Sequence, residues 1–254
     1  KRSIVRIPVA RPLEIPKRDL PLDPYVYGFW LGNGNAVKPE LTIRTCDVEH
    51  MERNIPYEIS SFWFQKGDGS KVLRIPALKS LLLPSFRDKK IQPGYLRASI
   101  AQRWALLQGL IDSDGFIGER KAQSTFVSTI RPLAESVREL LWSLGIKNAM
   151  TEDPSTRYGV PTGETLYTIR FTTFEDQPTS RLKRKFDRRR ERVKETRSCF
   201  HYIRDIEPIP YPVKMRCIEV DSPSHQYLAG TSMVPTHNSE LGAAIALNML
   251  VNDD

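Results

Sequence analysis

Two segments of the chain repeat one pattern, and this repeat constrains the fold more than any other feature. The segments are YVYGFWLGNGN (25–35) and LLQGLIDSDGF (106–116), which align without a gap. Each is typical of an apolar helix with small residues on one side that ends in a polar residue followed by glycine. Two such helices can pack with their backbones in close approach, which predicts that Asn33 and Asp114 meet at one end of the pair.

A pair of helix ends of this kind is a plausible place for metal-dependent chemistry. Paired carboxylates there can hold a divalent ion between two DNA strands, and the ion activates water for phosphodiester hydrolysis. The alternative interpretation is two buried helices with glycine caps. That alternative explains one copy easily and a matched pair less well.

Two further stretches indicate mixed helix and strand between 23 and 200. The stretch 130–146 predicts an amphipathic helix with one apolar face, formed by Leu133, Val137, Leu140, Leu141 and Leu144. Residues 165–172, TLYTIRFT, alternate apolar and polar side chains, which predicts a strand with one buried face and one polar face. Arg170 lies on the polar face.

A basic segment accounts for most of the net charge of +8. Residues 181–197, RLKRKFDRRRERVKETR, hold ten Lys or Arg against three acidic residues. Such a run is either a solvated helix or tail, or a surface that binds phosphate groups. The charge alone leaves both interpretations open.

The repeat carries a family resemblance. LLQGLIDSDG resembles the LAGLIDADG motif of homing endonucleases, and YGFWLGNGN resembles the first-copy form of intein-borne members. The resemblance implies an α+β fold with two pseudo-symmetric βαββα-type halves, about 23–102 and 103–200, whose curved sheets straddle the DNA major groove. It implies double-stranded DNA of the intein-free host gene as partner and Mg²⁺ as cofactor.

The same resemblance implies site residues. Asp114 is the expected catalytic metal ligand, whereas Asn33 stands where the family carries a second acid. An amide oxygen can bind a metal but brings no charge, so we expect nicking, slow cleavage or none. The expected DNA contacts are Arg170, Lys183, Arg184, Lys185, Arg188, Arg189 and Arg190.

A second resemblance concerns the C-terminal region. A lone His-Asn-Ser reads as a polar turn, but CIEVDSPSHQYLAGTSMVPTHN followed by Ser239 is similar to the C-terminal splicing motifs of inteins, which have the Hint fold. The resemblance implies that Asn238 cyclises to a succinimide and releases the chain at Ser239, whose hydroxyl has first accepted the upstream segment. His237 and His225 assist proton transfer. No cofactor is expected for splicing.

Cys217 has two possible roles. It stands where many inteins carry an aspartate that assists the first acyl shift, and a minority class uses a cysteine there as first nucleophile. Thr236, just before His237, fits that minority class. A buried or proton-relaying thiol remains the alternative.

The resemblances predict a domain plan. Residues 1–22 are expected to be the end of the N-terminal splicing half, 23–200 the endonuclease, 201–238 the C-terminal splicing region and 239–254 a host segment (C-extein). An initial Cys or Ser and a Thr-x-x-His block are not found, so we expect the C-terminal piece of an intein. Either the intein is split and its N-terminal fragment is a separate partner, or the sequence is truncated. SELGAAIALNML resembles the helix after a phosphate-binding loop, which suggests a P-loop ATPase host such as a phage terminase. The alternative is an Ala-rich amphipathic helix of some other enzyme.

Composition argues against a membrane protein, a secreted protein and a protein held by zinc or disulfides. The chain has no apolar run long enough for a membrane span and no signal peptide pattern, so we expect a cytoplasmic protein without a membrane partner. Three cysteines without metal spacing argue against zinc and disulfides. The alternative to a splicing element with a nuclease is a degenerate DNA-binding remnant, or a free-standing homing endonuclease without splicing activity.

Overall fold

The computed structural model divides the chain into two compact units. It describes residues 6–64, 69–118, 123–157, 159–173, 178–188, 199–203, 208, 210–212, 218 and 220–237. One unit is Pro12–Lys194, and the other combines Lys1–Arg11 with Glu195–Asp254. No helix in these described ranges has the length and apolar character to cross a membrane.

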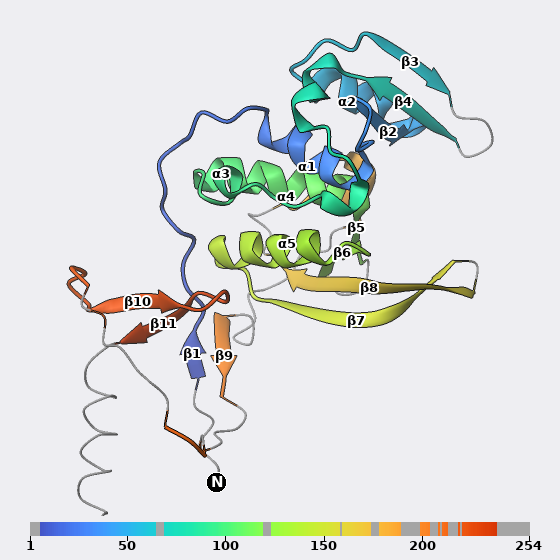
Figure 1. The fold of residues 1–254 in the computed structure, drawn as a ribbon. Coiled ribbons are helices and arrows are strands. Elements are labelled where there is room, and N and C mark those ends of the chain that lie inside the picture. Colours follow the sequence, from blue (N-terminus) through green and yellow to red (C-terminus); the bar gives the residue numbers. More distant parts are fainter. Residues whose placement is uncertain are drawn as a thin grey trace, which may run out of the picture. The chain divides into compact units, whose positions relative to one another are not determined.

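The larger unit is built around two helices that contain the repeated segments. Helix α1 spans Pro24–Asn33 and helix α4 spans Ile100–Asp114, and they lie side by side (Figure 1). Asp23 caps α1 by accepting hydrogen bonds from two backbone N–H groups of its first turn. Ser99 caps α4 through a reciprocal capping box with Gln102. Both predicted helices are therefore present, and both end at the polar residue of the repeat.

The first half continues from α1 into a three-stranded sheet. The elements are β2 (Glu40–Arg44), η1 (Thr45–Asp47), α2 (Val48–Asn54), β3 (Ser61–Phe64) and β4 (Ser70–Arg74). The antiparallel order is β2-β4-β3. Three short helical turns then lead to α4, namely η2 (Pro76–Leu81), η3 (Phe86–Asp88) and α3 (Pro93–Leu96).

The second half repeats this arrangement with longer strands. Its elements are β5 (Gly115–Ile117), β6 (Gln123–Ser128), α5 (Arg131–Ser143), β7 (Asn148–Arg157), β8 (Val160–Thr172) and α6 (Lys183–Phe186). The order is β5-β6-β8-β7, and α5 covers one face of the sheet (Figure 1). The predicted helix and strand of this half are confirmed, and so is the α+β class. Each half begins with its motif helix, so the order is helix, strand, helix and two strands, with one extra strand in the second half.

One apolar core fills the unit. Helix α1 is buried on every side from Tyr25 to Leu31, which explains its lack of a polar face. The five leucine and valine side chains of the predicted α5 face are also buried. A buried arginine, Arg103, sits at the edge of this core and donates to the backbone carbonyls of Ala98, Ser143 and Leu13.

Residues 12–22 belong to this larger unit. The backbone N–H of Arg18 donates to Gln102 Oε1 at 3.0 Å, and Gln102 Nε2 donates back to the Arg18 carbonyl at 2.6 Å. Farther along, the Leu22 N–H donates to the Tyr95 hydroxyl at 3.0 Å. The division at residues 11 and 194 therefore differs from the sequence-based boundaries at 22 and 200.

The described residues of the smaller unit form two antiparallel strand pairs. Strand β1 (Arg6–Pro8) pairs with β9 (Phe200–Tyr202), and β10 (Gln226–Ala229) pairs with β11 (Val234–His237). The second pair lies in the region that resembles the splicing motifs.

Candidate DNA-cleavage and splicing sites

The two motif helices approach each other through reciprocal glycines. A methyl group added at Gly28 would lie 2.2 Å from the carbonyl oxygen of Leu106 on the other helix. One added at Gly109 would lie 2.1 Å from the carbonyl oxygen of Tyr25. Both distances are far below van der Waals contact, so only glycine allows this approach. Each glycine meets the carbonyl three residues before its counterpart, which gives the pair approximate twofold symmetry.

The C-terminal ends of the helices also meet. A methyl group at Gly32 would lie 2.2 Å from Ser113 Oγ and 3.2 Å from Asp114 Cγ. Asn33, the next residue of α1, is half-buried, and Asp114 is exposed. The structure therefore brings together the two helix ends that the repeat predicts, with one carboxylate and one amide.

Asp114 is exposed to solvent, but its carboxyl group is packed against protein atoms. Although the residue reaches water, the protein atoms packed around its carboxyl group raise its pKa above the ordinary value. The positive charges of Lys89 and Lys185 oppose this shift. Both lysines act on the one carboxylate, although they come from different halves of the unit.

Each of these lysines closes the end of one motif helix. The ammonium group of Lys89 donates to three carbonyl oxygens at the end of α1, those of Trp30 at 2.9 Å, Gly32 at 3.4 Å and Gly34 at 2.7 Å. The ammonium group of Lys185 donates likewise at the end of α4, to Ile111 at 2.6 Å, Asp112 at 2.9 Å and Gly115 at 2.8 Å. Burial lowers the pKa of each lysine to about 8.

The sequence pattern does not predict Lys89 at this site, and it predicts Lys185 as a DNA contact. Lys89 lies in a short polar stretch without periodicity, and its three acceptors are on a helix more than fifty residues away. One signal was available, because the same number of residues separates Arg74 from Lys89 and Arg170 from Lys185. That signal becomes visible only when the strand register of the two halves is known.

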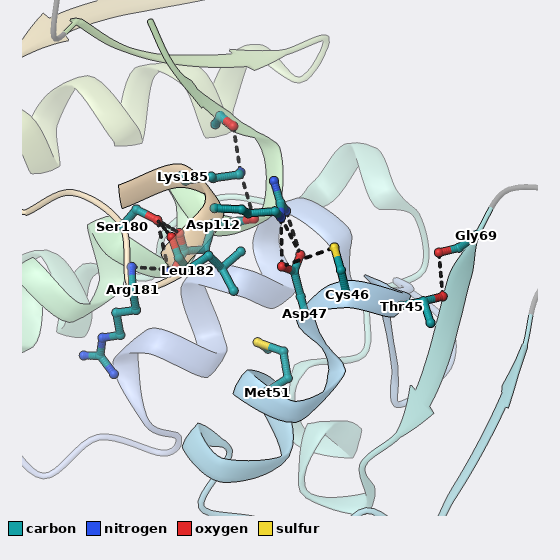
Figure 2. Close-up of polar contacts among 12 residues, drawn as sticks. Thr45, Cys46, Asp47, Met51, Gly69, Asp112, Ser180, Arg181, Leu182 and Lys185 are labelled. Atoms are coloured by element: carbon teal, nitrogen blue, oxygen red, sulfur yellow. Dashed lines mark hydrogen bonds and ion pairs between the residues drawn. The ribbon is translucent and has the colours of Figure 1, made fainter. Parts of the chain in front are cut away.

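A second carboxylate of the motif, Asp112, is a buried structural hub. It accepts a hydrogen bond from the Tyr25 hydroxyl at 2.9 Å. It also accepts hydrogen bonds from the Ser180 hydroxyl and from the Arg181 N–H at 2.9 Å (Figure 2). Burial raises the pKa of Asp112, and these donors oppose the rise. Asp112 thus ties α1, α4 and the chain around residue 180 together, and it is closed off from a metal or a phosphate.

The chain from 178 to 187 is bound to both halves. The Pro178 carbonyl accepts hydrogen bonds from Trp104 Nε1 at 3.1 Å and Gln108 Nε2 at 2.8 Å. Arg184 forms a bidentate ion pair with Asp47 of the first half, with its closest approach at 2.6 Å.

A cavity of about 560 Å³ lies beside this pair and is lined by residues of α2 and of 182–187. All three cations of its lining are paired with acids, so it offers no excess charge to a ligand.

These contacts change the expected roles of the basic segment. Lys185 is buried and shared among three carbonyls, and Arg184 is held by Asp47, so a phosphate contact by either finds no support in this geometry. Lys183 is 86% exposed, and its ion-pair partner among the described residues is its helix neighbour Asp187, at 2.6 Å. Arg188 lies 5.8 Å from the ring centre of Phe116. Arg189 and Arg190 lie outside the described residues.

Arg170 occupies the predicted polar face of β8. It is exposed, and its Nη1 donates to Thr151 Oγ1 of the neighbouring strand at 3.2 Å. The buried residues on either side, Ile169 and Phe171, face the core. The sheet therefore presents Arg170 on the side away from α5.

The residues at the helix ends fit a metal ion that has few protein ligands rather than one coordinated entirely by protein. Among the described residues, no group of three or more His, Cys, Asp or Glu could hold a metal ion. Mg²⁺ is commonly bound through one or two carboxylates, with water and substrate phosphate oxygens completing its shell. Asp114 with the amide oxygen of Asn33 is compatible with that mode.

The smaller unit brings together two of the predicted splicing residues. The register of β10 and β11 places Gln226 opposite His237, and the rings of His225 and His237 lie edge to face with centroids 6.3 Å apart. His225 has a positive φ of 50°, a conformation that few non-glycine residues adopt. Thr236 Oγ1 donates to the Val234 carbonyl at 3.1 Å. Cys217, Asn238 and Ser239 lie outside the described residues.

Comparisons with known proteins agree with the motif. Residues 101–177 match the family described as LAGLIDADG-like domain. The chain is 36% identical over 233 residues to a Mycobacterium intracellulare protein described as replicative DNA helicase DnaB, a match that covers 92% of this chain and 38% of the relative. It is 50% identical over 44 residues to the replicative DNA helicase DnaB of Mycobacterium leprae, which is 17% of this chain and 7% of that protein. The chain thus spans well under half the length of these curated relatives.

Two solved structures of the homing endonuclease I-DmoI are also similar. One, of mesophilic variants, has a TM-score of 0.40 at 18% identity and covers 60% of this chain and 88% of that chain. The other, in complex with DNA and Mn, has a TM-score of 0.38 at 18% identity and covers 60% of this chain and 89% of that chain.

Proposed function

We propose two activities for this chain. It carries a LAGLIDADG-like domain, and most of its length is homologous to a protein described as DnaB, which fits an intein with an inserted endonuclease. The 23–200 region is a site-specific DNA endonuclease, and the 201–238 region performs the C-terminal steps of protein splicing. Residues 239–254 are the start of the host segment. The relatives favour a replicative DNA helicase as host over the phage terminase that the sequence suggested.

The observation that carries the endonuclease proposal is the close meeting of α1 and α4 at Gly32, Ser113 and Asp114. It puts a solvent-accessible carboxylate where two twofold-related sheets begin. Asp114 and the amide oxygen of Asn33 would hold Mg²⁺, which when bound supplies a Lewis acid for the phosphoryl oxygen and an acidified water. Lys89 and Lys185 keep the two helix ends in place and balance the charge of Asp114.

The difference between the C-terminal ends of α1 and α4 predicts whether one or both DNA strands are cut. Asn33 adds no negative charge where the second half has Asp114, so only one centre attracts a divalent cation strongly. We therefore expect cleavage of one strand to dominate over cleavage of both. The DNA partner is the uninterrupted host gene, contacted by the exposed cations Arg170, Lys183 and Arg188, together with Arg189 and Arg190.

The test uses a supercoiled plasmid that carries the uninterrupted helicase gene. With Mg²⁺ the purified chain should nick this plasmid and leave a plasmid without the gene supercoiled, and EDTA should stop the reaction. Binding to a duplex of the junction should weaken steeply with salt, because each phosphate contact releases counterions. Equal nicking of both plasmids would reject site-specific cleavage.

The splicing proposal rests on the pairing of His225 with His237 directly before Asn238. The side-chain nitrogen of Asn238 attacks its own backbone carbonyl, the bond to the Ser239 nitrogen breaks, and that nitrogen takes up a proton. His237 supplies the proton, and His225 assists the transfer. The upstream segment, already esterified to the Ser239 hydroxyl, then moves to the freed amine and forms a peptide bond.

Mass spectrometry tests this order of events. Mixed with a matching N-terminal intein fragment, the chain should yield a ligated product that begins its host part at Ser239, and Asn238→Ala should keep residues 239–254 attached. Cys217→Ala should abolish the branched intermediate if Cys217 is the first nucleophile, whereas normal splicing by Cys217→Asp would assign it to proton relay. Unchanged tail release from Asn238→Ala would refute succinimide formation.

A second candidate, a DNA-binding remnant that no longer cuts, is favoured by the amide at Asn33. It predicts site-specific binding without nicking at any Mg²⁺ concentration, so the plasmid assay distinguishes the two.

A further inference from the structure

The strand register of the first half leads from its motif helix to one exposed arginine. Gly34, directly after α1, forms a bridge to Leu41 of β2. Leu41 in turn pairs with Leu73 of β4. Leu73 is fully buried, so the next residue, Arg74, faces the opposite side of the sheet.

The second half follows the same path to Arg170. Gly115, directly after α4, pairs with Phe126 of β6, and Phe126 pairs with Ile169 of β8. Ile169 is fully buried, and the next residue is Arg170. Arg74 and Arg170 are therefore counterparts, each one strand position beyond the residue that is linked through the sheet to the end of a motif helix.

The positions of the capping lysines support this equivalence independently. The same number of residues separates Arg74 from Lys89 and Arg170 from Lys185. The alignment of the two sheets thus extends to the residues that close the motif helices.

Each arginine is held in place by a neighbouring strand. Arg74 Nη2 lies 3.0 Å from Glu40 Oε1, and the Arg74 side chain is 47% exposed whereas that of Glu40 is 8% exposed. Arg170 Nη1 donates to Thr151 Oγ1 at 3.2 Å. In both cases one edge of the guanidinium is anchored to the sheet, and the residue remains open to solvent.

We propose that Arg74 and Arg170 read guanine bases at equivalent positions in the two half-sites of the DNA target. This inference rests on the proposed endonuclease function. An arginine that donates to O6 and N7 of guanine is the commonest specific contact in the major groove, which admits a β-ribbon. Anchoring by Glu40 and Thr151 orders the guanidinium before binding, so less side-chain entropy is lost in the complex.

The two anchors differ, and this difference affects affinity. Glu40 neutralises Arg74, whereas Arg170 has no ion pair within the described part of the chain and its anchor Thr151 carries no charge. Arg170 therefore contributes more to salt-dependent attraction, and Arg74 contributes mainly through geometry.

The experiment is selection of bound sequences from a library of randomised duplexes by the wild-type chain, Arg74→Ala and Arg170→Ala. The controls are Arg53→Ala and Arg131→Ala, which remove exposed, ion-paired arginines from α2 and α5 on the helical side of each half. We expect the wild type to select guanine at two positions related by the twofold symmetry of the site. Each β-strand variant should lose the preference at one of them by about 10- to 100-fold, and the controls should keep both.

Four outcomes would contradict the account. Uniform loss of affinity without loss of base preference would show phosphate contacts, and loss of preference at one shared position would deny the twofold relation; either overturns the proposal. Arg74→Lys and Arg170→Lys should recover affinity more than guanine preference, because lysine cannot form the bidentate contact. If the wild type itself selects no sequence, the proposed DNA function fails. If the wild type selects a sequence and the variants select the same one, only the proposal that the two arginines read guanine fails.

Discussion

Lys89 and Lys185 are twofold-related counterparts, and each shares one buried ammonium group among three carbonyl oxygens at the end of a motif helix. The C-terminal end of a helix carries partial negative charge. Two such ends meet beside the carboxylate of Asp114. Their negative charges would repel one another without a nearby positive charge. The two lysines supply that compensation and satisfy carbonyl groups that the helices leave free.

The first prediction concerns these caps. Lys89→Met and Lys185→Met keep the length of the side chain but remove its donors, and we expect each to lower the free energy of unfolding by about 2–3 kcal/mol. Lys90→Met and Lys183→Met are the controls, because both lysines are exposed. Urea unfolding followed by circular dichroism measures the difference. Equal stability of cap variants and controls would contradict the capping role.

The second prediction concerns pH. Burial lowers the pKa of both lysines from 10.5 to about 8, so between these values the folded chain has released protons that the unfolded chain still holds. The free energy of unfolding should then rise from pH 8 to pH 10, by about 1–2 kcal/mol per lysine. Above pH 10 it should fall, because burial raises the pKa of Tyr27 and Tyr95 in the folded chain and only the unfolded chain ionises them.

The double variant Lys89→Met, Lys185→Met isolates the lysine contribution. It should lack the rise between pH 8 and pH 10 and keep the fall above pH 10. A rise that persists in the double variant would assign the effect to other groups.

The third prediction concerns the helix crossing. Gly28→Ala and Gly109→Ala each force a methyl group against a backbone carbonyl, so the helices must separate, at an expected cost of about 3 kcal/mol. Gly94→Ala is the control, since no atom lies within 4 Å of the added carbon. Thermal unfolding should show a lower midpoint for the first two variants only. A midpoint for Gly28→Ala that matches the control would mean that the helices are not in contact there.

The fourth prediction separates structural from DNA-binding cations in one segment. Arg184→Gln leaves the buried carboxylate of Asp47 without its partner, so we expect a loss of about 2 kcal/mol of stability. Lys183→Gln should leave stability unchanged and reduce the salt dependence of DNA binding by about one counterion. Paired urea unfolding and DNA titrations at several salt concentrations measure both. The opposite assignment, with Lys183 as the stabilising residue, would refute the role of the Arg184 pair.

The sequence predicted what depends on local pattern. Helix 131–143 and the strand through Arg170 follow from residue spacing, and the meeting of α1 and α4 follows from repeated glycines that allow close approach. The roles of Lys185 and Arg184 could not be predicted, because an isolated basic run does not reveal that Asp47 or the end of α4 lies beside it. The equivalence of Arg74 and Arg170 depends on strand register, which is fixed by long-range pairing.

The most direct measurement resolves the products of plasmid cleavage at the uninterrupted host site, with Mg²⁺, for the unaltered chain and three variants. The unaltered chain should give nicked circles, Asp114→Asn should give none while it still binds the site, and Asn33→Asp should shift the product toward linear DNA. Glu49→Gln, which removes an exposed acid from α2, should behave like the unaltered chain. Double-strand cleavage by the unaltered chain that Asp114→Asn leaves unchanged would contradict the assignment of the catalytic centre to the joined ends of α1 and α4.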